Sequence, residues 1–375
     1  MKRDNISFNV DALKNNFVKT EFSDIEMSEN FLSATIRDTT FPIVTHNGMF
    51  HADDVFTVAL IWLSRICFKN KYFETANPVK LKWTEVLNGL TRISSIEEIH
   101  YKTCLVVDVK NGHYDHHHVS DGDKTWWGDD AGMHPMASFG CLWNAIGGAF
   151  NIDLDDPTIV NFNVDKLLYK EFIELIDLRD LKGPEIESPI SQVISNVNSY
   201  SEYDFDFVKP ENFDKLDEQA KSDYKFVEAV MMAYKILRNE IIRCQNHMRS
   251  YNSITSNDAI ELGSNENGVN YLKIKEVENK KDEPFIALDV IKNVNINGKP
   301  IDILINENPS IRDNSFRCVC VDTTKRSFES NACKTVEGVK FYHPQNFMVT
   351  FETKDYLNNF VKNLKILNDD TKMGI

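Results

Sequence analysis

Short apolar runs alternate with longer segments of helical period between residue 41 and about residue 200. Phe41–Val44 and Ile99–Val109 are rich in β-branched residues, as buried strands are, whereas Asp53–Ile66 and Tyr169–Leu181 repeat apolar residues at helical spacing. A further short helix is expected at Trp83–Leu90. Strands that alternate with helices predict a parallel sheet, so we expect an α/β fold for this half of the chain.

The second half of the chain begins with a long helix, because apolar residues repeat at helical spacing from about Lys225 to Tyr251. Residues 256–270 are rich in Asn, Gly and Ser and are expected to mark a domain boundary. A smaller α/β domain follows, with a final helix that Thr353 caps and that runs through Leu367. Its expected strands are Tyr271–Val277, Phe285–Val290, Ile301–Ile305, Phe316–Val321 and Lys340–His343.

These patterns divide the chain of 375 residues into consecutive parts. We expect an N-terminal extension over residues 1–40, a first domain over residues 41–225, a connecting helix over residues 226–256 and a smaller C-terminal domain over residues 257–375. A chain of this length can bury a core in each of two domains.

Charge and cysteine content narrow the classes of function. The net charge of −15 disfavours docking along a long phosphate backbone, which needs clustered Lys and Arg, although a short strand end could still enter a metal-lined cleft. The seven cysteines are scattered, and Cys318 and Cys320 are too close for an ordinary disulfide along one strand, so reduced thiols are expected. No apolar run reaches transmembrane length, and the first residues lack the apolar segment of a signal peptide, so we expect a cytoplasmic protein.

The stretch Leu105–His118, LVVDVKNGHYDHHH, carries the densest candidate chemistry. Asp108 ends its apolar run, and Asp115 and the histidines from His116 to His118 follow. Ligands of open α/β sheets bind outside the carboxyl ends of the strands, so acids and histidines at this point indicate a metal site. Taken alone, Asp108 is equally well explained as a turn former, and the histidines as a surface run.

A second cluster follows the first expected strand and changes this balance. His46, His51, Asp53 and Asp54 fall within nine residues, and Gly48 permits a tight loop among them. Two strand tips that each carry His and Asp can converge on one point when the strands are neighbours. A mixed set of nitrogen and oxygen ligands suits Mn²⁺, with Mg²⁺, Co²⁺ or Zn²⁺ as alternatives. The competing interpretation, a polar loop that caps a helix, explains only one cluster at a time.

Two further segments add candidates. Ser138 is a good N-cap residue and Gly140 permits close backbone approach at the start of an apolar helix, whose N-terminus is a ready anion site. Glu174, Asp177 and Asp180 are spaced by three and share one face of another helix. An acidic stripe of this kind is most often solvated surface, so its spacing alone does not assign it to a site.

The segments THNGMFHADD, LVVDV and DHHH resemble the first three motifs of the DHH phosphoesterase superfamily. The closest resemblance is to the melanocyte-proliferating-gene branch, whose first motif has the form T-H-x-G-x-F-H-x-D; this chain has Asp54 where the branch usually has Glu. The fourth motif, E-x-I-D-x-x-D, fits at Glu174, Ile176, Asp177 and Asp180. The resemblance extends unevenly from residue 41 to about residue 370.

The resemblance implies a doubly wound parallel sheet, a smaller C-terminal domain, and an active site in the cleft between them. It also implies two divalent ions, held by residues of the 41–225 domain. One ion would bind His46, His51 and Asp108, and the other Asp53, Asp108, His116 and Asp177, with Asp108 as the bridge. His117 would face the substrate and donate to its phosphoryl oxygens, and Asp115 would orient His116. Asp180 is the second choice to Asp177.

The resemblance is partial in the C-terminal domain. VKFYHPQNF is similar to the family block F-x-H-x-x-G-F, with matches at His343 and Phe347. Residues 348–350 replace the paired glycines that usually follow, and Asn331 replaces the Arg of an S-F-x-S-R block. The substrate-binding residues that the resemblance implies are Ser138, Gly140 and His343.

The implied activity is hydrolysis of a phosphodiester by a water that two metal ions activate, with RNA or short oligonucleotides as substrates of an exonuclease. One alternative is a phosphohydrolase for a dinucleotide, a cyclic dinucleotide or pyrophosphate, which the acidic charge and the missing glycines favour. Another is a catalytically weak, metal-binding regulatory protein; the complete ligand set argues against it, because buried His and Asp without a metal are costly. We expect no membrane partner, and a homodimer is left open as the assembly.

Overall fold

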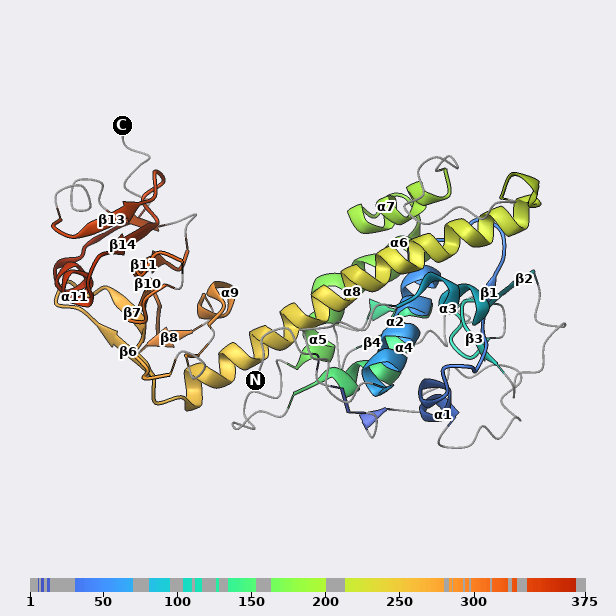
Figure 1. Cartoon of the computed structure of the whole chain (residues 1–375), viewed down its shortest axis with the longest axis horizontal. Helices are drawn as coiled ribbons and strands as arrows, with labels where there is room; N and C mark the ends of the chain where they lie inside the picture. Colours follow the sequence, from blue (N-terminus) through green and yellow to red (C-terminus); the bar gives the residue numbers. More distant parts are fainter. Residues whose placement is uncertain are drawn as a thin grey trace. The chain divides into compact units, whose positions relative to one another are not determined.

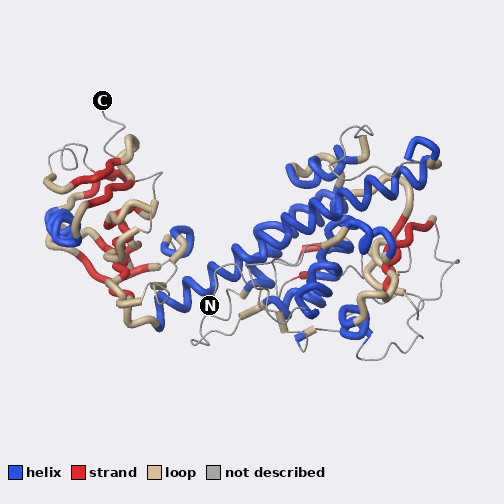
Figure 2. Tube along the Cα trace, in the orientation of Figure 1, coloured by secondary structure: helices blue, strands red, loops and turns tan. Residues whose placement is uncertain are grey.

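A computed structural model of the chain describes residues 6, 8–9, 12–13, 31–69, 81–94, 104–109, 112–116, 126–127, 134–152, 163–199, 213–279, 283–284, 286–292, 294–296, 298–310, 312–322, 326–328 and 336–368. The chain divides into two compact units (Figure 1), one within residues 1–153 and 159–245 and the other within residues 154–158 and 246–375. Most helices belong to the first unit and most strands to the second (Figure 2). The fold is mixed α/β, with a small parallel sheet in the first unit and a six-stranded mixed sheet in the second.

The parallel sheet of the first unit has the order β2-β1-β3. Its strands are β1 (Ile43–His46), β2 (Leu90–Ile93) and β3 (Leu105–Val106). The expected strand Phe41–Val44 overlaps β1, which extends two residues further, and Ile99–Val109 contains β3, which is much shorter. The helix expected over Trp83–Leu90 is α3 (Trp83–Asn88), which ends two residues earlier. The strand β2, which follows it, was not predicted. With only Ile93 fully buried, the sequence LTRI lacks the continuous apolar run that marks an interior strand.

Helix α2 (Ala52–Lys69) forms the core of the first unit. It is buried continuously from Ala52 to Cys67, and this explains why its sequence is apolar on all sides. It contacts helices on several sides, so its N-terminus, which bears Asp53 and Asp54, is held rigidly. Its partners are α1 (Phe31–Arg37), α4 (Ser138–Ile146), α6 (Glu174–Lys182) and α7 (Pro189–Val197).

The helix α1 lies within the segment that was expected to be an extension, but it packs on the first unit. Leu32 and Ile36 are fully buried. The buried guanidinium of Arg65, on α2, donates to the Thr35 carbonyl at 3.1 Å and to the Phe41 carbonyl at 2.7 Å. These bonds tie α1 and the residues before β1 to the central helix, so residues 31–40 are part of the folded unit.

Between α4 and α6 the chain forms a 3₁₀ turn, Gly147–Phe150, the short helix α5 (Val164–Leu168) and a π-helical turn, Tyr169–Ile173. The 39-residue helix α8 (Glu218–Ser256) follows and is longer at both ends than the pattern predicted. The division between the two units falls inside α8, after Gln245.

The sheet of the second unit has the order β13-β14-β11-β10-β7-β6, in which β7 and β10 are parallel and the other neighbours antiparallel. Its strands are β6 (Ile260–Ser264), β7 (Asn270–Ile274), β10 (Ile303–Asn306), β11 (Phe316–Cys320), β13 (Val339–Tyr342) and β14 (Met348–Phe351). Pairs of short strands are β4 (Trp126–Trp127) with β5 (His134–Pro135), β8 (Asn295–Ile296) with β9 (Lys299–Pro300), and β12 (Arg326–Phe328) with β15 (Ile366–Asn368).

Three expectations for the second unit need correction. The described part of Phe285–Val290 forms no strand and instead leads into the helix α9 (Leu288–Ile291). The strands β6 and β14 were not predicted, because Gly and Asn surround the first and Thr350 interrupts the second. Thr353 does cap the last helix, by accepting a hydrogen bond from the Tyr356 amide, but α11 (Lys354–Asn363) ends before Leu367.

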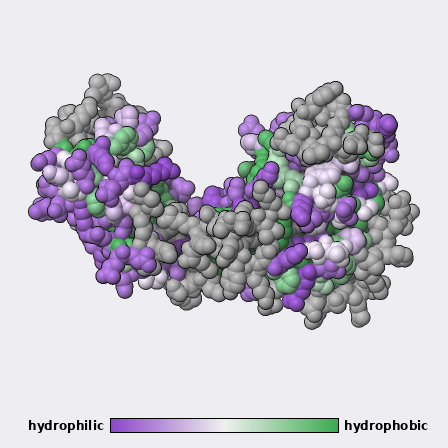
Figure 3. All heavy atoms as spheres, viewed as in Figure 1, coloured by the Kyte–Doolittle hydropathy of each residue, from purple (hydrophilic) through white to green (hydrophobic). Residues whose placement is uncertain are grey.

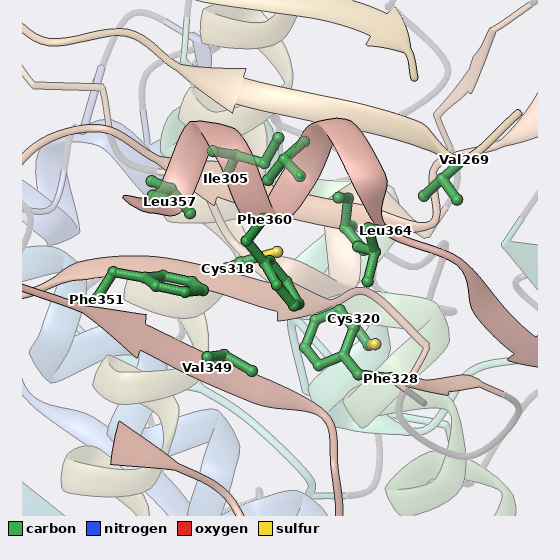
Figure 4. Packing of buried hydrophobic residues seen from close by; sticks show 12 residues of the cluster. Val269, Ile305, Cys318, Cys320, Phe328, Val349, Phe351, Leu357, Phe360 and Leu364 are labelled. Carbon is green, nitrogen blue, oxygen red and sulfur yellow. The ribbon is translucent and has the colours of Figure 1, made fainter. Parts of the chain in front are cut away.

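The two faces of this sheet are covered by different elements. On one face α11 contributes Leu357 and Phe360, which pack with Cys318, Val349 and Phe351 (Figure 4). On the other face, α9 and the end of α8 cover Leu272 and Ile274 on β7 with a second cluster. The surface seen in Figure 3 is mainly hydrophilic over the second unit. No helix in the described parts of the chain is long and apolar enough to cross a membrane.

Candidate metal centre

The candidate centre begins at the carboxyl end of β1. The Nδ1 atom of His46 donates to the Asn47 carbonyl oxygen at 2.9 Å, since that oxygen can only accept, so in the neutral ring that a metal ion requires Nε2 would carry the lone pair. That Nε2 atom lies 2.9 Å from Oδ2 of Asp54 and 3.4 Å from Oδ2 of Asp108. The backbone therefore orients His46 as a metal ligand would be oriented.

Asp108, at the end of β3, lies at the middle of the centre. Its Oδ1 accepts a hydrogen bond from the Ser138 hydroxyl at 2.8 Å and lies 3.4 Å from Nδ1 of His116, while Oδ2 faces His46. Its φ angle of 47° is left-handed, which is unusual for a residue other than Gly and is common at functional sites. The two oxygens of one carboxylate thus face histidines from two different segments, as a bridging ligand requires.

Three overlapping groups of side chains could each hold one cation, with all ligand atoms of a group within 4.8 Å of one another. Asp108 belongs to two groups and so does Asp53, which links all three into one continuous centre. The groups are His46 with Asp54 and Asp108, Asp53 with Asp108 and His116, and His51 with Asp53 and Asp180.

The carboxylate of Asp53 is the least satisfied group in this centre. The residue is fully buried, and among the described residues neither of its oxygens accepts a hydrogen bond. The Nδ1 atom of His116 lies 4.0 Å from its Oδ2. Burial raises the pKa of Asp53 well above its usual range, and the neighbouring carboxylates of Asp108 and Asp180 raise it further.

Aspartates converge here at a density that is costly in a protein interior unless cations or protons neutralise them. Asp53, Asp54, Asp108 and Asp177 are all buried. Divalent metal ions would neutralise these charges and complete the coordination of Asp53, and the mixed imidazole and carboxylate donors suit such ions. The residues present therefore fit a metal centre.

The histidines and acids also perturb one another. Burial lowers the pKa of His46, but Asp54 and Asp108 outweigh it and raise that pKa to about 11. The pKa of Asp180 is lowered despite its burial, because His116 and His51 form hydrogen bonds to it. Its Oδ2 is 2.9 Å from Nε2 of His116, and its Oδ1 is 3.4 Å from Nδ1 of His51.

Asp177, which the resemblance implies as a ligand, lies against the first turn of α4. Its Oδ1 accepts a hydrogen bond from the Gly140 amide at 3.1 Å, in the first turn of α4, and it belongs to none of the three cation-binding groups of described residues. A side chain at position 140 would lie 1.9 Å from Oδ2 of Asp177, so only Gly fits there. The N-terminus of α4 is therefore already filled by a carboxylate of the chain itself.

Ser138 is the first residue of α4, and its N-cap is Ala137. The Ser138 hydroxyl donates to Asp108 and the side chain is fully buried, so Ser138 holds the Asp108 carboxylate in position. Asp115 is buried next to His116 in sequence, while His117 lies outside the described residues. The roles that were predicted for these residues toward substrate stay predictions.

Sequence reasoning named Asp54 without assigning it to an ion, and ranked Asp180 second. Asp54 also accepts a hydrogen bond from the His51 amide at 3.0 Å, which is the return bond of a capping box at the start of α2. Its position as the third residue of α2 is therefore the sequence signal of a capping box. That Asp54 also lies close to His46 depends on how the loop between β1 and α2 turns.

A buried arginine that sequence reasoning missed supports the loop between β1 and α2. Arg92, on β2, has a side chain that is 1% exposed. Its Nε donates to the His46 carbonyl at 3.0 Å and its Nη2 to the Gly48 carbonyl at 2.8 Å. Its guanidinium lies over the ring of Phe226, on α8, with 4.6 Å to the centroid. Nothing in the local sequence LTRI indicates these contacts.

The third predicted substrate residue, His343, belongs to the second unit. It follows β13, and its ring packs on that of Phe347 at a tilt of 39°, with 3.9 Å between centroids. Its Nδ1 accepts a hydrogen bond from the Gln345 amide at 3.2 Å, which places the proton of a neutral ring on Nε2. These contacts of His343 are all with residues of the second unit.

Fold and site together define an α/β protein with a buried centre of histidines and aspartates suited to divalent metal ions. Over residues 42–335 the chain matches the family described as MYG1 exonuclease, uncharacterised protein family UPF0160, and it belongs to that family. This match confirms the family resemblance predicted from the motifs.

Over 100 residues the chain is 32% identical to the MYG1 protein of Chlamydia pneumoniae. The match spans 27% of this chain and 30% of that protein. No solved structure matches the chain.

Proposed function

We propose that the chain is a metal-dependent phosphodiester hydrolase that shortens RNA or short oligonucleotides from an end. The observation that carries this proposal is the buried, unsatisfied carboxylate of Asp53 within a cluster of four further aspartates and three histidines. Without cations, the burial of these carboxylates would be offset only by protonation and by the neighbouring histidines. The family name points to the same class of reaction.

We propose the ligands from the three groups of side chains. Asp108 and Asp53 would each contact more than one ion, His46 and Asp54 would complete one position, and His116 another. When bound, a pair of divalent ions lowers the pKa of a shared water and stabilises the attacking and leaving oxygens of a phosphoryl group. Mn²⁺ is our first choice because it accepts both imidazole and carboxylate ligands.

The surrounding residues would keep these ligands in place and keep bulk water out. Ser138 fixes one oxygen of Asp108, and the Asn47 carbonyl fixes the tautomer of His46. His51 is the most accessible histidine of the centre, with a side chain that is 58% exposed, so the substrate would approach from its side. The predicted donor to the phosphoryl oxygens remains His117.

A second candidate function is hydrolysis of a small phosphate substrate such as a dinucleotide, a cyclic dinucleotide or pyrophosphate. The position of Asp177 favours it, because this carboxylate fills the helix N-terminus that could otherwise bind a further backbone phosphate. The net charge of −15 acts in the same direction.

The two candidates are separated by Mn²⁺-dependent hydrolysis of an end-labelled RNA oligomer, a dinucleotide, a cyclic dinucleotide and pyrophosphate. Asp108→Asn is the control, because it keeps the size of the side chain and removes its charge. We expect stepwise shortening of the oligomer that the substitution abolishes. Turnover of only the small substrates would select the second candidate. Metal binding without any turnover would indicate a regulatory protein and contradict both.

A further inference from the structure

An irregularity in β13 turns an aromatic side chain away from the core of the second unit. Val339 pairs with Phe351 and Phe341 pairs with Thr350, so the register shifts by one residue between them. Val339 packs with Phe351 in the cluster under α11. Without the shift Phe341 would share that face, because strand residues two apart point the same way. Bulges that re-aim one side chain occur preferentially near functional sites.

Phe341 heads a row of residues on the sheet face opposite α11. Thr350 on β14 is its partner, and Arg317 on β11 is in turn the partner of Thr350. The neighbours Val349 and Cys318 face α11, so this row faces away from that helix. Phe341 is 45% exposed and Arg317 is also exposed, and in the described part of the chain Arg317 makes no ion pair.

The residues between and beside Phe341 and Arg317 are also suited to contact a ligand. Thr350 is buried between them, and its hydroxyl has no hydrogen-bond partner among the described residues. The ring of His343 meets that of Phe341 edge to face with 6.3 Å between centroids, and packs against the ring of Phe347. The hydrogen bond from Gln345 to Nδ1 of His343 leaves the Nε2 proton available as a donor. An aromatic surface, a hydrogen-bond donor and a cation are thus adjacent.

We propose that the row of Phe341, Thr350 and Arg317 is a binding site for single-stranded nucleic acid. An exposed aromatic ring stacks on any base, and a guanidinium pairs with a phosphate. Two strand spacings separate Phe341 from Arg317, about 10 Å, and the long side chain of Arg317 shortens that span. Pyrophosphate has no base for Phe341 to contact. The inference rests on the proposed function and selects its oligonucleotide form.

Binding of fluorescently labelled single-stranded RNA to the full chain, measured by anisotropy in EDTA, tests the stacking contact. Phe341→Ala is expected to weaken binding about tenfold, and Phe341→Trp to retain it. The matched control is Leu262→Ala, since Leu262 is 41% exposed on β6 at the other edge of the same sheet and should have no effect. An equal loss for the two alanine variants would overturn the proposal.

An abasic version of the same oligomer distinguishes stacking from a change in the fold. The wild-type chain should bind it about tenfold more weakly than the base-bearing oligomer, and Phe341→Ala should bind the two equally. Retention of the full difference in Phe341→Ala would refute the contact. Arg317→Gln should reduce the slope of log affinity against log salt concentration by about one, because one phosphate contact is lost. Arg312 is an exposed arginine before the same strand, and Arg312→Gln should leave the slope unchanged.

The proposed function is tested apart from this site by Mn²⁺-dependent hydrolysis of bis(p-nitrophenyl) phosphate, with the wild-type chain and Asp108→Asn. If RNA binding depends on Phe341 but neither protein hydrolyses the ester or RNA, the nucleic-acid site stands and the hydrolase assignment fails. If RNA is hydrolysed in a metal-dependent manner while Phe341→Ala binds RNA as the wild type does, the hydrolase stands and the site fails.

Discussion

Arg92 and Asp223 form an ion pair, with 3.1 Å between Nη1 and Oδ1, that joins a strand of the small sheet to the N-terminal part of α8. The same guanidinium holds two carbonyls of the loop that carries His46 and His51. Ser222, next to Asp223, also donates to the Gly48 carbonyl, at 3.1 Å. The helix that continues into the second unit is therefore bonded to the backbone of the loop between His46 and His51.

Arg92→Lys should lower metal affinity, because one ammonium cannot donate to both loop carbonyls and pair with Asp223. Burial lowers the pKa of Arg92, and Asp54 and Asp223 counteract it, so the wild-type side chain stays charged. We expect about a tenfold loss of Mn²⁺ affinity by calorimetry, as for other outer-shell partners. Lys221→Gln is the control, since its pair with Glu218 on the same helix is exposed and contributes little. Unchanged affinity in Arg92→Lys would show that the loop keeps its position without this residue.

Asp180→Asn and Asp177→Asn should differ in their effect on metal binding. Asp180 lies against His116 and His51, so we expect its substitution to weaken Mn²⁺ binding by at least about tenfold. Asn at position 177 can still accept the hydrogen bond of the Gly140 amide, so most of the affinity should remain. Calorimetric titration of both variants decides the question. A larger loss in Asp177→Asn would assign the ligand as the family motif suggested.

Gly140→Ala should destabilise the first unit, because its methyl group would lie within 1.9 Å of the buried Asp177 carboxylate. Overpacking of this kind costs about 1–3 kcal/mol, and the shift of Asp177 would be felt at the metal centre. Gly148→Ala is the matched control, as the nearest atom to its methyl group would be 3.6 Å away. Urea unfolding of both variants measures the difference. Equal stability would mean that α4 or α6 moves aside without cost.

His113 should make the stability of the chain fall with decreasing pH. Burial lowers the pKa of His113 to about 4, and its Nδ1 accepts a hydrogen bond from the Val106 amide at 2.9 Å, which requires that nitrogen to be unprotonated. The unfolded chain binds this proton near pH 6.5 and the folded chain only near pH 4, so the contribution is complete above pH 6.5 and is lost as the pH falls through that interval.

The lowered pKa of His113 corresponds to about 3 kcal/mol of unfolding free energy, which is lost between about pH 6.5 and about pH 4. His113→Gln keeps an acceptor for the Val106 amide and cannot titrate, so its stability should depend less on pH in this range. Parallel urea titrations at several pH values, each with EDTA, provide the comparison. Identical pH slopes for the two proteins would contradict the buried, neutral state of His113.

The sequence by itself was sufficient where residues that act together are close along the chain. His46, His51 and Asp53 fall on one loop and one helix start, so their spacing, together with the cluster that follows Asp108, predicted a metal site. Periodicity identified α2 and α8 because both bury long apolar segments. The apolar run that ends at Asp108 placed that carboxylate at a strand tip, where the structure has it.

Only the tertiary structure determined which way each carboxylate of α6 faces and which residues hold the loop between β1 and α2 in place. Asp177 and Asp180 share one face of α6 by their spacing, and the packing of α6 against α4 directs the first to Gly140 and the second to His116. Arg92 contacts partners 46 and 131 residues away along the chain. Contacts over such separations leave no local pattern of apolar and polar positions, because they depend on how the elements pack after they have formed.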